Sequence, residues 1–300
     1  MSALDNIITH IQLPIKNAEQ AQRLFHGRGH AYDDLNHVTI DWLPPVLLIT
    51  LFAPESPENV KNLTDQLQGI LSNCKSIQLQ HRYQLNGPFD ILHGEKITQL
   101  VIEENKLKYQ LQLGKSRNSG LFLDMRNGRK WVQDHSEGKR VLNLFSYTCG
   151  FSVAAIAGGA RSILNVDMSS AALSVGRANH RLNQHNLKQV KFEKLNIFNS
   201  FGRLKRNGPF DLLICDPPTL QKDSVDIKRD YPKIMRRLDE FMALDSMLIL
   251  CLNAPELGRE FLITNMAELA PKYQFIEEIT SPKVYAEAQN KGLKVLLFRN

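Results

Sequence analysis

The chain has 300 residues, of which 43% are apolar and 23% charged, and its net charge is +6. This composition is typical of a folded protein with a sizeable core, and no apolar run reaches the roughly 18 residues that a membrane span requires. Four widely spaced cysteines without a Cys-x-x-Cys pair argue against a disulfide framework or a zinc site. His180 and His185 also lack the spacing of a zinc site, so we expect no metal site. The first residues lack the layout of a signal peptide, and with the cysteine usage this predicts a cytoplasmic protein.

The charge is unevenly distributed along the chain. Residues 1–114 contain 9 Lys and Arg against 12 Asp and Glu, whereas residues 115–300 contain 28 against 19. Such an asymmetry favours a polyanionic partner, above all nucleic acid, for the second part. The alternative is a soluble domain with an excess of basic side chains.

The first part of the chain has a mixed α+β pattern, with apolar residues at both helical and strand spacing. We expect helices over 17–25 and 57–73, strands over 38–42, 46–52 and 76–82, and a hairpin of strands 100–104 and 107–113.

From Val141 onward, strand-like and helix-like segments alternate, which predicts a mostly parallel, Rossmann-like sheet with helices on both faces. The last strand follows the sixth too closely for a helical crossover, so we expect it to be antiparallel. The expected strands are 141–145, 162–166, 190–194, 210–215, 246–252, 273–278 and 293–298, and the helices are 150–158, 169–184, 225–243 and 256–269.

An apolar strand, Phe210–Cys215, ends abruptly in Asp216-Pro217-Pro218-Thr219. Two prolines disfavour both helix and strand pairing, so they predict a rigid corner that holds one carboxylate and free carbonyl groups. Ligands of open α/β sheets bind at the carboxyl ends of the strands, where this corner would lie. The alternative is a rigid loop that only shapes the sheet edge.

The turn after the first of these strands predicts the type of cofactor. It contains a single glycine, Gly150, and lacks the Gly-x-Gly-x-x-Gly pattern that binds a pyrophosphate, so S-adenosylmethionine suits it better than a dinucleotide. Asp167, followed by Met168, is placed to accept hydrogen bonds from both ribose hydroxyls, or else to cap the next helix. Asn196, followed by Ile197, could contact the adenine or cap a helix. The residues of the turn that we expect at the cofactor are Asn143, Phe145, Ser146, Tyr147, Thr148 and Gly150, joined by Asp216.

Four blocks in this order resemble one family. They are Lys115–Arg126, Val141–Thr148, Val166–Ser169 and Asp216–Thr219. The chain is similar to class I S-adenosylmethionine-dependent methyltransferases related to those of bacterial large-subunit (23S) ribosomal RNA, which make 5-methylcytosine or N7-methylguanine. The N-terminal part resembles a proteobacterial branch of the family. The resemblance implies a seven-stranded mixed sheet and a cofactor pocket to which Asn118, Gly120, Phe122, Asp124 and Arg126 contribute.

The corner resembles the motif of enzymes that methylate exocyclic amines, but Thr219 stands where those enzymes have an aromatic residue that stacks on the base. Thr219 is more similar to the N7-guanine branch. Methylation of carbon 5 needs a cysteine nucleophile, and Cys251 falls inside the expected strand, where a buried core cysteine is the favoured interpretation. Asn253 is the better candidate to face the pocket, with Pro217 and Pro218 completing the edge.

A basic run follows the corner, and its cations recur at helical spacing. Phosphate contacts beside the transfer site and a solvated helix face are equally good interpretations, and Tyr231 could stack on a base. The run consists of Lys222, Lys228, Arg229, Lys233, Arg236 and Arg237.

Together these patterns predict two domains: an N-terminal α+β domain over 1–112 for substrate placement, and a methyltransferase domain over 113–300. We expect direct methyl transfer from S-adenosylmethionine to a base in RNA, with ribosomal RNA as the substrate, by a monomer or a homodimer. Two alternatives remain at this point: a methyltransferase for a protein or small molecule, and a non-catalytic protein that binds RNA or the cofactor.

Overall fold

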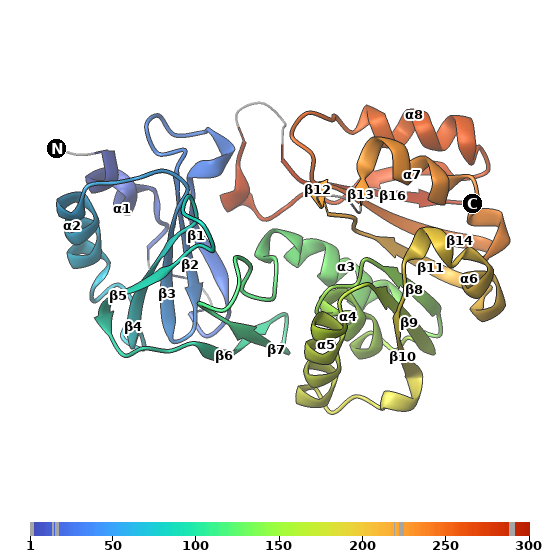
Figure 1. The fold of residues 1–300 in the computed structure, drawn as a ribbon, viewed down its shortest axis with the longest axis horizontal. Helices are drawn as coiled ribbons and strands as arrows, with labels where there is room; N and C mark the ends of the chain where they lie inside the picture. Colours follow the sequence, from blue (N-terminus) through green and yellow to red (C-terminus); the bar gives the residue numbers. More distant parts are fainter. Residues whose placement is uncertain (1–2, 14, 16–17, 219, 222–224, 288–291) are drawn as a thin grey trace. The chain divides into compact units, whose positions relative to one another are not determined.

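The computed structural model describes residues 3–13, 15, 18–218, 220–221, 225–287 and 292–300. The chain forms two compact units, one of Met1–Asp124 with Pro282–Asn290 and one of Met125–Ser281 with Lys291–Asn300 (Figure 1). The linking segment 113–124 therefore groups with the first unit, although we expected the second domain to begin at residue 113.

The second unit is built on a seven-stranded sheet in the order β10-β9-β8-β11-β14-β16-β15. Neighbouring strands from β10 to β14 are parallel, while β16 runs antiparallel to β14 and β15. This confirms the expected mixed sheet with an antiparallel last strand. The strands are β8 (Arg140–Leu144), β9 (Ser162–Asp167), β10 (Val190–Lys194), β11 (Phe210–Cys215), β14 (Met242–Leu252), β15 (Gln274–Glu278) and β16 (Lys294–Arg299), with a short β12 (Leu220–Gln221) and β13 (Val225–Asp226) pair outside the sheet.

Helices cover both faces of this sheet, with α4 and α5 on one side and α6, α7 and α8 on the other (Figure 1). The helix expected over 225–243 is shorter than predicted, because the chain turns after Met235 and β14 already begins at Met242. The helices are α3 (Arg126–His135), α4 (Gly150–Ala157), α5 (Ser170–Leu182), α6 (Phe201–Asn207), α7 (Ile227–Met235) and α8 (Glu260–Leu269).

The first unit holds a five-stranded sheet, ordered β1-β2-β3-β4-β5, and a separate hairpin of β6 and β7. The helix expected over 17–25 is wrong: β1 occupies Gln22–His26 and pairs antiparallel with β2. Leu24 and Phe25 are buried in the strand, and with Ala18 and Ala21 their spacing imitated a helix. The other elements are α1 (Ile7–His10), β2 (Val38–Leu43), β3 (Val46–Leu51), α2 (Pro57–Leu67), β4 (Ser76–His81), β5 (Phe89–Gly94), β6 (Gln99–Glu104) and β7 (Leu107–Gln112).

Candidate functional site

The candidate site lies at the carboxyl edge of the seven-stranded sheet. Strands β8 and β11 are neighbours at its centre, and the chain leaves β8 toward β9 on one side and reaches β11 on the other. This reversal of strand order opens a crevice beyond the strand ends, which is where open α/β sheets bind their ligands. The turn after β8 and the corner after β11 are therefore brought together, as the sequence predicted.

The turn that joins β8 to α4 has a strained backbone. Phe145, Tyr147 and Cys149 all have left-handed φ angles, of 56°, 46° and 62°. Residues other than glycine seldom adopt this conformation, and they do so mainly where the surrounding structure enforces it at functional sites. The N–H of Ser146 donates to the carbonyl of Val166 at 3.1 Å, which fixes the turn against β9.

Asp167, at the end of β9, is held by two backbone groups. One carboxylate oxygen accepts the N–H of Tyr147 at 2.8 Å and the other accepts the N–H of Ser169 at 2.8 Å. Each carboxylate oxygen can accept a further hydrogen bond, so a ribose with two hydroxyls fits this rigid pair of acceptors. The adjacent Met168 is 51% exposed, an apolar surface that a bound adenosine would cover. The cap of α5 is Ser169, whose hydroxyl accepts the N–H of Ala172.

Asn196 follows β10 and caps the short turn that begins at Ile197. Its side-chain oxygen accepts the N–H of Phe198 at 3.0 Å. The capping interpretation is therefore confirmed, and contact with an adenine stays a prediction. Ile197 is buried in the core.

A series of hydrogen-bonded polar side chains runs from the end of β8 through the core, and sequence reasoning missed it. The Asn143 amide donates to Asn165, and Asn165 donates to the Ser152 hydroxyl, each at 2.9 Å. Ser152 lies 2.8 Å from Nε2 of His180, whose Nδ1 lies 3.0 Å from Nδ1 of His185. Burial, together with the neighbouring His185, lowers the pKa of His180 to about 3, so the His180 ring is uncharged near neutral pH. Asn143 thus supports the turn from within the sheet.

The remaining side chains of the turn are largely enclosed. The Ser146 hydroxyl is buried, with no hydrogen-bond partner among the described residues other than the weakly accepting thiol of Cys149 beside it. The carbonyl of Thr148 accepts the side-chain amide of Asn179 at 3.0 Å. Gly150 begins α4. The turn is also pressed against α5 at Gly176, where a Cβ would lie 2.4 Å from the Cys149 sulfur.

Strand β11 ends at Cys215, directly before the corner, as predicted. Asp216 and Pro218 are half-buried, Pro217 is buried, and Asn253 beyond β14 is exposed. Thr219 and Lys222 lie outside the described residues.

Tyr231 of α7 ties the two strand ends at this corner together. Its hydroxyl lies 2.9 Å from the carbonyl oxygen of Cys215 and 2.8 Å from that of Cys251. The expectation that Tyr231 stacks on a base is wrong, because the side chain is 2% exposed and fills the core.

None of the four cysteines is an exposed thiol. Cys149, Cys215 and Cys251 are buried and Cys74, in the first unit, is half-buried. Burial raises the pKa of Cys149 to about 12 and that of Cys215 well above its usual range. Cys251 lies inside β14 and is fully buried, as the core interpretation predicted.

The basic run on α7 is largely neutralised. Asp230 accepts hydrogen bonds from Arg229 at 2.8 and 2.9 Å and from Lys233 at 2.8 Å, and the hydrogen bonds to Arg229 hold the pKa of Asp230 well below its usual range. Residues 226–240 contain five basic and four acidic side chains. The solvated-face interpretation therefore fits this helix better than a phosphate clamp.

The block before α3 is divided between the units. Arg126 begins α3 in the second unit, and the other four predicted residues lie in the first. There, Asn118 accepts a hydrogen bond from Arg82 at 2.8 Å, Gly120 has a φ of 121°, Phe122 is 44% exposed and Asp124 is half-buried. Their part in a cofactor pocket stays a prediction.

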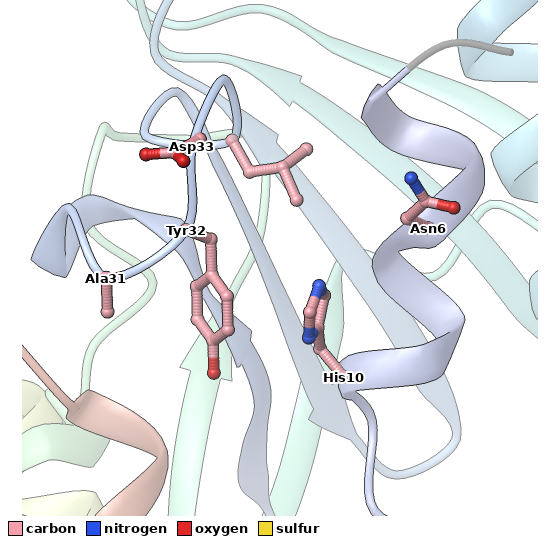
Figure 2. A pocket seen from close by; sticks show the side chains of 6 residues that line it. Asn6, His10, Ala31, Tyr32 and Asp33 are labelled. Atoms are coloured by element: carbon pink, nitrogen blue, oxygen red, sulfur yellow. The ribbon is translucent and has the colours of Figure 1, made fainter.

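A separate pocket of about 290 Å³ lies in the first unit (Figure 2). The rings of His10 and Tyr32 lie side by side in it, with 4.5 Å between their centroids. None of the predicted site residues lines it; its walls are Asn6, His10, Ala31, Tyr32, Asp33 and Leu35.

Among the described residues, no helix is both long and apolar enough to cross a bilayer. In the same residues, no group of three or more His, Cys, Asp or Glu side chains is arranged to hold a metal ion.

Comparison with known proteins agrees with this geometry. Residues 22–299 match the family model of S-adenosylmethionine-dependent methyltransferases. YwbD of Bacillus subtilis, named for the ribosomal RNA large subunit methyltransferases, is 29% identical over 93% of this chain and 74% of its own length. Ribosomal RNA large subunit methyltransferase K of Neisseria meningitidis is 33% identical over 67% of this chain, which spans 56% of that relative's length.

A solved structure shares the fold of the whole chain. SMU.776, a methyltransferase in complex with S-adenosylhomocysteine, superposes with a TM-score of 0.88 at 22% identity, covering 100% of this chain and 82% of its own. The rigid acceptors of Asp167, the exposed Met168 beside them and the strained turn after β8 fit an adenosine-bearing cofactor. The chain belongs to the S-adenosylmethionine-dependent methyltransferase family, and S-adenosylmethionine is its cofactor.

Proposed function

We propose that this enzyme methylates a base in RNA of the large ribosomal subunit, in the cytoplasm. The observation that carries the proposal is the Asp216-Pro217-Pro218 corner, which ends β11 at the sheet centre beside the turn after β8. The names of the relatives support RNA as the substrate, as does the net charge of +9 over residues 115–300.

The cofactor would be held by the elements that end at this edge. Asp167 binds the ribose hydroxyls, Met168 flanks the adenine, and the backbone of Asn196 and Ile197 adjoins it, with the Asn196 side-chain oxygen accepting a hydrogen bond from the adenine amino group. The turn Phe145–Gly150 faces the amino-acid part of the cofactor, joined by Asp216. When bound, S-adenosylmethionine supplies an electrophilic methyl group.

The chain's own residues position the base rather than attack it. No exposed thiol is present at the edge, because Cys215 and Cys251 are both buried in strands. Asp216, the carbonyls of the two prolines, Thr219 and Asn253 form a polar rim that orients the acceptor atom. Orientation alone can account for a large share of a transfer barrier when the acceptor is already nucleophilic. We therefore propose direct transfer to the base, without a covalent enzyme intermediate.

We further propose that the first unit places the substrate. Residues 1–114 have a net charge of −3, which is unsuited to a general clamp on the phosphate backbone. A role in selecting the modified position fits this composition better.

Ribosomal RNA from a strain that lacks the protein provides the test. Purified enzyme with methyl-labelled S-adenosylmethionine should label the large-subunit RNA at one base, and mass spectrometry of nucleosides should identify it. Asp216→Ala should fold normally and lose at least about 100-fold in rate, because a misplaced acceptor costs that much. Absence of label in this RNA, or label in protein instead, would overturn the proposal.

A further inference from the structure

A long stretch of almost purely basic charge lies outside the corner and its helix. Residues 168–209 contain eight Lys and Arg and a single acidic side chain, Glu193. A net charge of +7 over this segment exceeds the +6 of the whole chain. All eight cations are exposed: Arg177, Arg181, Lys188, Lys191, Lys194, Arg203, Lys205 and Arg206.

These cations surround one edge of the seven-stranded sheet. Strand β10 is the edge strand, α5 precedes it and packs on it, and α6 follows it (Figure 1). Lys194 pairs in register with Asp167, so the charged surface begins next to the candidate ribose site. From there it follows β10 for five residues, a length of about 16 Å.

Few of these charges are neutralised within the protein. Glu193 forms an ion pair with Arg203, which donates hydrogen bonds to both carboxylate oxygens at 2.7 and 2.9 Å. Arg177 lies over the ring of Phe192, 4.4 Å from its centre, and Lys191 is 3.4 Å from the amide oxygen of Asn207. Among the described residues, Arg203 is the one member of this set seen in an ion pair with a carboxylate.

The opposite edge of the sheet has the opposite charge. It ends in β15, whose Glu277 and Glu278 precede the antiparallel β16. Residues 252–281, which contain α8 and β15, hold five acidic and two basic side chains. The sheet is therefore electrostatically polarised, and a polyanion is attracted to one edge and repelled from the other.

We propose that the β10 edge, defined by the eight cations named above, binds the phosphate backbone of the RNA substrate. This inference rests on the proposed function and adds the path of the substrate to it. Exposed cations without carboxylate partners release counterions when phosphates replace them, which makes such binding strongly dependent on salt. The path leads the RNA to the carboxyl ends of β9 and β10, where the cofactor would lie.

Two triple variants with the same change in net charge test this surface. The test variant is Arg181→Ala, Lys188→Ala and Lys191→Ala, which avoids the candidate cofactor residues. The control is Arg259→Ala, Lys272→Ala and Arg299→Ala, three exposed cations on the side of β15. A labelled fragment of large-subunit ribosomal RNA is titrated at several salt concentrations, methyl transfer to it is followed, and calorimetry gives the affinity for S-adenosylhomocysteine.

The test variant should lose at least about tenfold in RNA affinity, and its log–log salt slope should become shallower by roughly two. Its KM for RNA should rise while kcat and cofactor affinity stay within about twofold of wild type. The control should match wild type in all measurements. If both variants bind and methylate RNA equally well, the β10 edge is not the RNA-binding surface, but the proposed RNA methylation is unaffected. If the wild-type enzyme neither binds nor methylates RNA, both the binding surface and the proposed function are wrong.

Discussion

The hydroxyl of Tyr231 lies 2.8 Å from the carbonyl oxygen of Cys251 and so joins α7 to the end of β14. Cys215 pairs with Leu250 in the parallel register of β11 and β14, which places the ends of the two strands side by side. Pro217 follows on the β11 side and has no N–H to donate to a strand ladder. The same Tyr231 hydroxyl lies 2.9 Å from the carbonyl oxygen of Cys215, so it contacts both strand ends beside the Asp-Pro-Pro corner.

Replacing Tyr231 with Phe should therefore affect transfer more than cofactor binding. Loss of a hydrogen bond to buried carbonyls should lower the free energy of unfolding by about 1–3 kcal/mol. The rate of methyl transfer should fall at least about tenfold, because Asp216 and Asn253 lie at the ends of the strands that Tyr231 joins. Urea unfolding, transfer kinetics and calorimetry with S-adenosylhomocysteine measure the three quantities.

Tyr273→Phe is a matched control for that variant. Its hydroxyl lies 3.3 Å from that of Ser246 and the side chain is buried in the same unit. It should lose stability of the same order and keep its rate of transfer. Equal losses of rate in both variants would show that Tyr231 acts only through stability.

Asp167→Ala should abolish most cofactor affinity. Two hydrogen bonds to a carboxylate contribute about 1.5–3 kcal/mol each, so the dissociation constant of S-adenosylhomocysteine should rise by at least about 100-fold in calorimetry. Asp211→Ala is the control, because that carboxylate also accepts a backbone N–H, from Arg140 at 2.7 Å, but at the amino end of its strand. An affinity of Asp167→Ala near that of wild type would assign Asp167 a purely structural role.

Cys251→Ala should keep its activity. The thiol is buried inside β14, so its removal should cost about 0.5–3 kcal/mol of stability and leave the rate of transfer within a few fold of wild type. If Cys251 were a nucleophile, the variant would be inactive while still folded. Single-turnover transfer on the folded variant separates the two cases.

The pKa of His180 predicts how stability depends on pH. Burial lowers this pKa from 6.5 to about 3, so below pH 6.5 the unfolded chain takes up a proton that the folded protein excludes. The contribution is fully present above pH 6.5 and is lost by about 1.4 kcal/mol for each pH unit as the pH falls toward 3. His180→Gln should therefore lose about 2 kcal/mol less than wild type between pH 6.5 and 5 in urea unfolding. An unchanged pH dependence in His180→Gln would contradict the assignment.

The spacing of apolar residues and the positions of prolines were sufficient to predict the seven-stranded sheet of the second unit. Apolar runs predicted the seven strands of this sheet, although β15 is mostly exposed and the short β12 and β13 were not predicted. The short connection before β16 predicted its direction, and the prolines after Cys215 predicted the end of β11. The position of Asp167 at a strand end also followed from order alone. These features depend on local sequence, which is why they could be read directly.

Features that depend on contacts between distant segments could not be predicted. Tyr231 looked like an exposed aromatic in a basic run, because nothing local shows that its hydroxyl meets two carbonyls 16 and 20 residues away. The hydrogen-bonded chain from Asn143 to His185 joins four elements in the same way. In the first unit, antiparallel pairing with β2 overrode the helical spacing around Phe25.

Segment Pro282–Asn290 is part of the first unit although β15 and β16 on either side of it belong to the second. Tyr285 anchors it there, with its ring 4.9 Å from that of His26 and 5.1 Å from the Arg23 guanidinium. The chain therefore passes between the units three times, and neither unit is a continuous piece of sequence. Cutting the chain after residue 124 would not separate two domains. The C-terminal fragment would keep Pro282–Asn290, which packs against residues of the N-terminal fragment. Engineering that exchanges one of the units therefore has to exchange this segment with it.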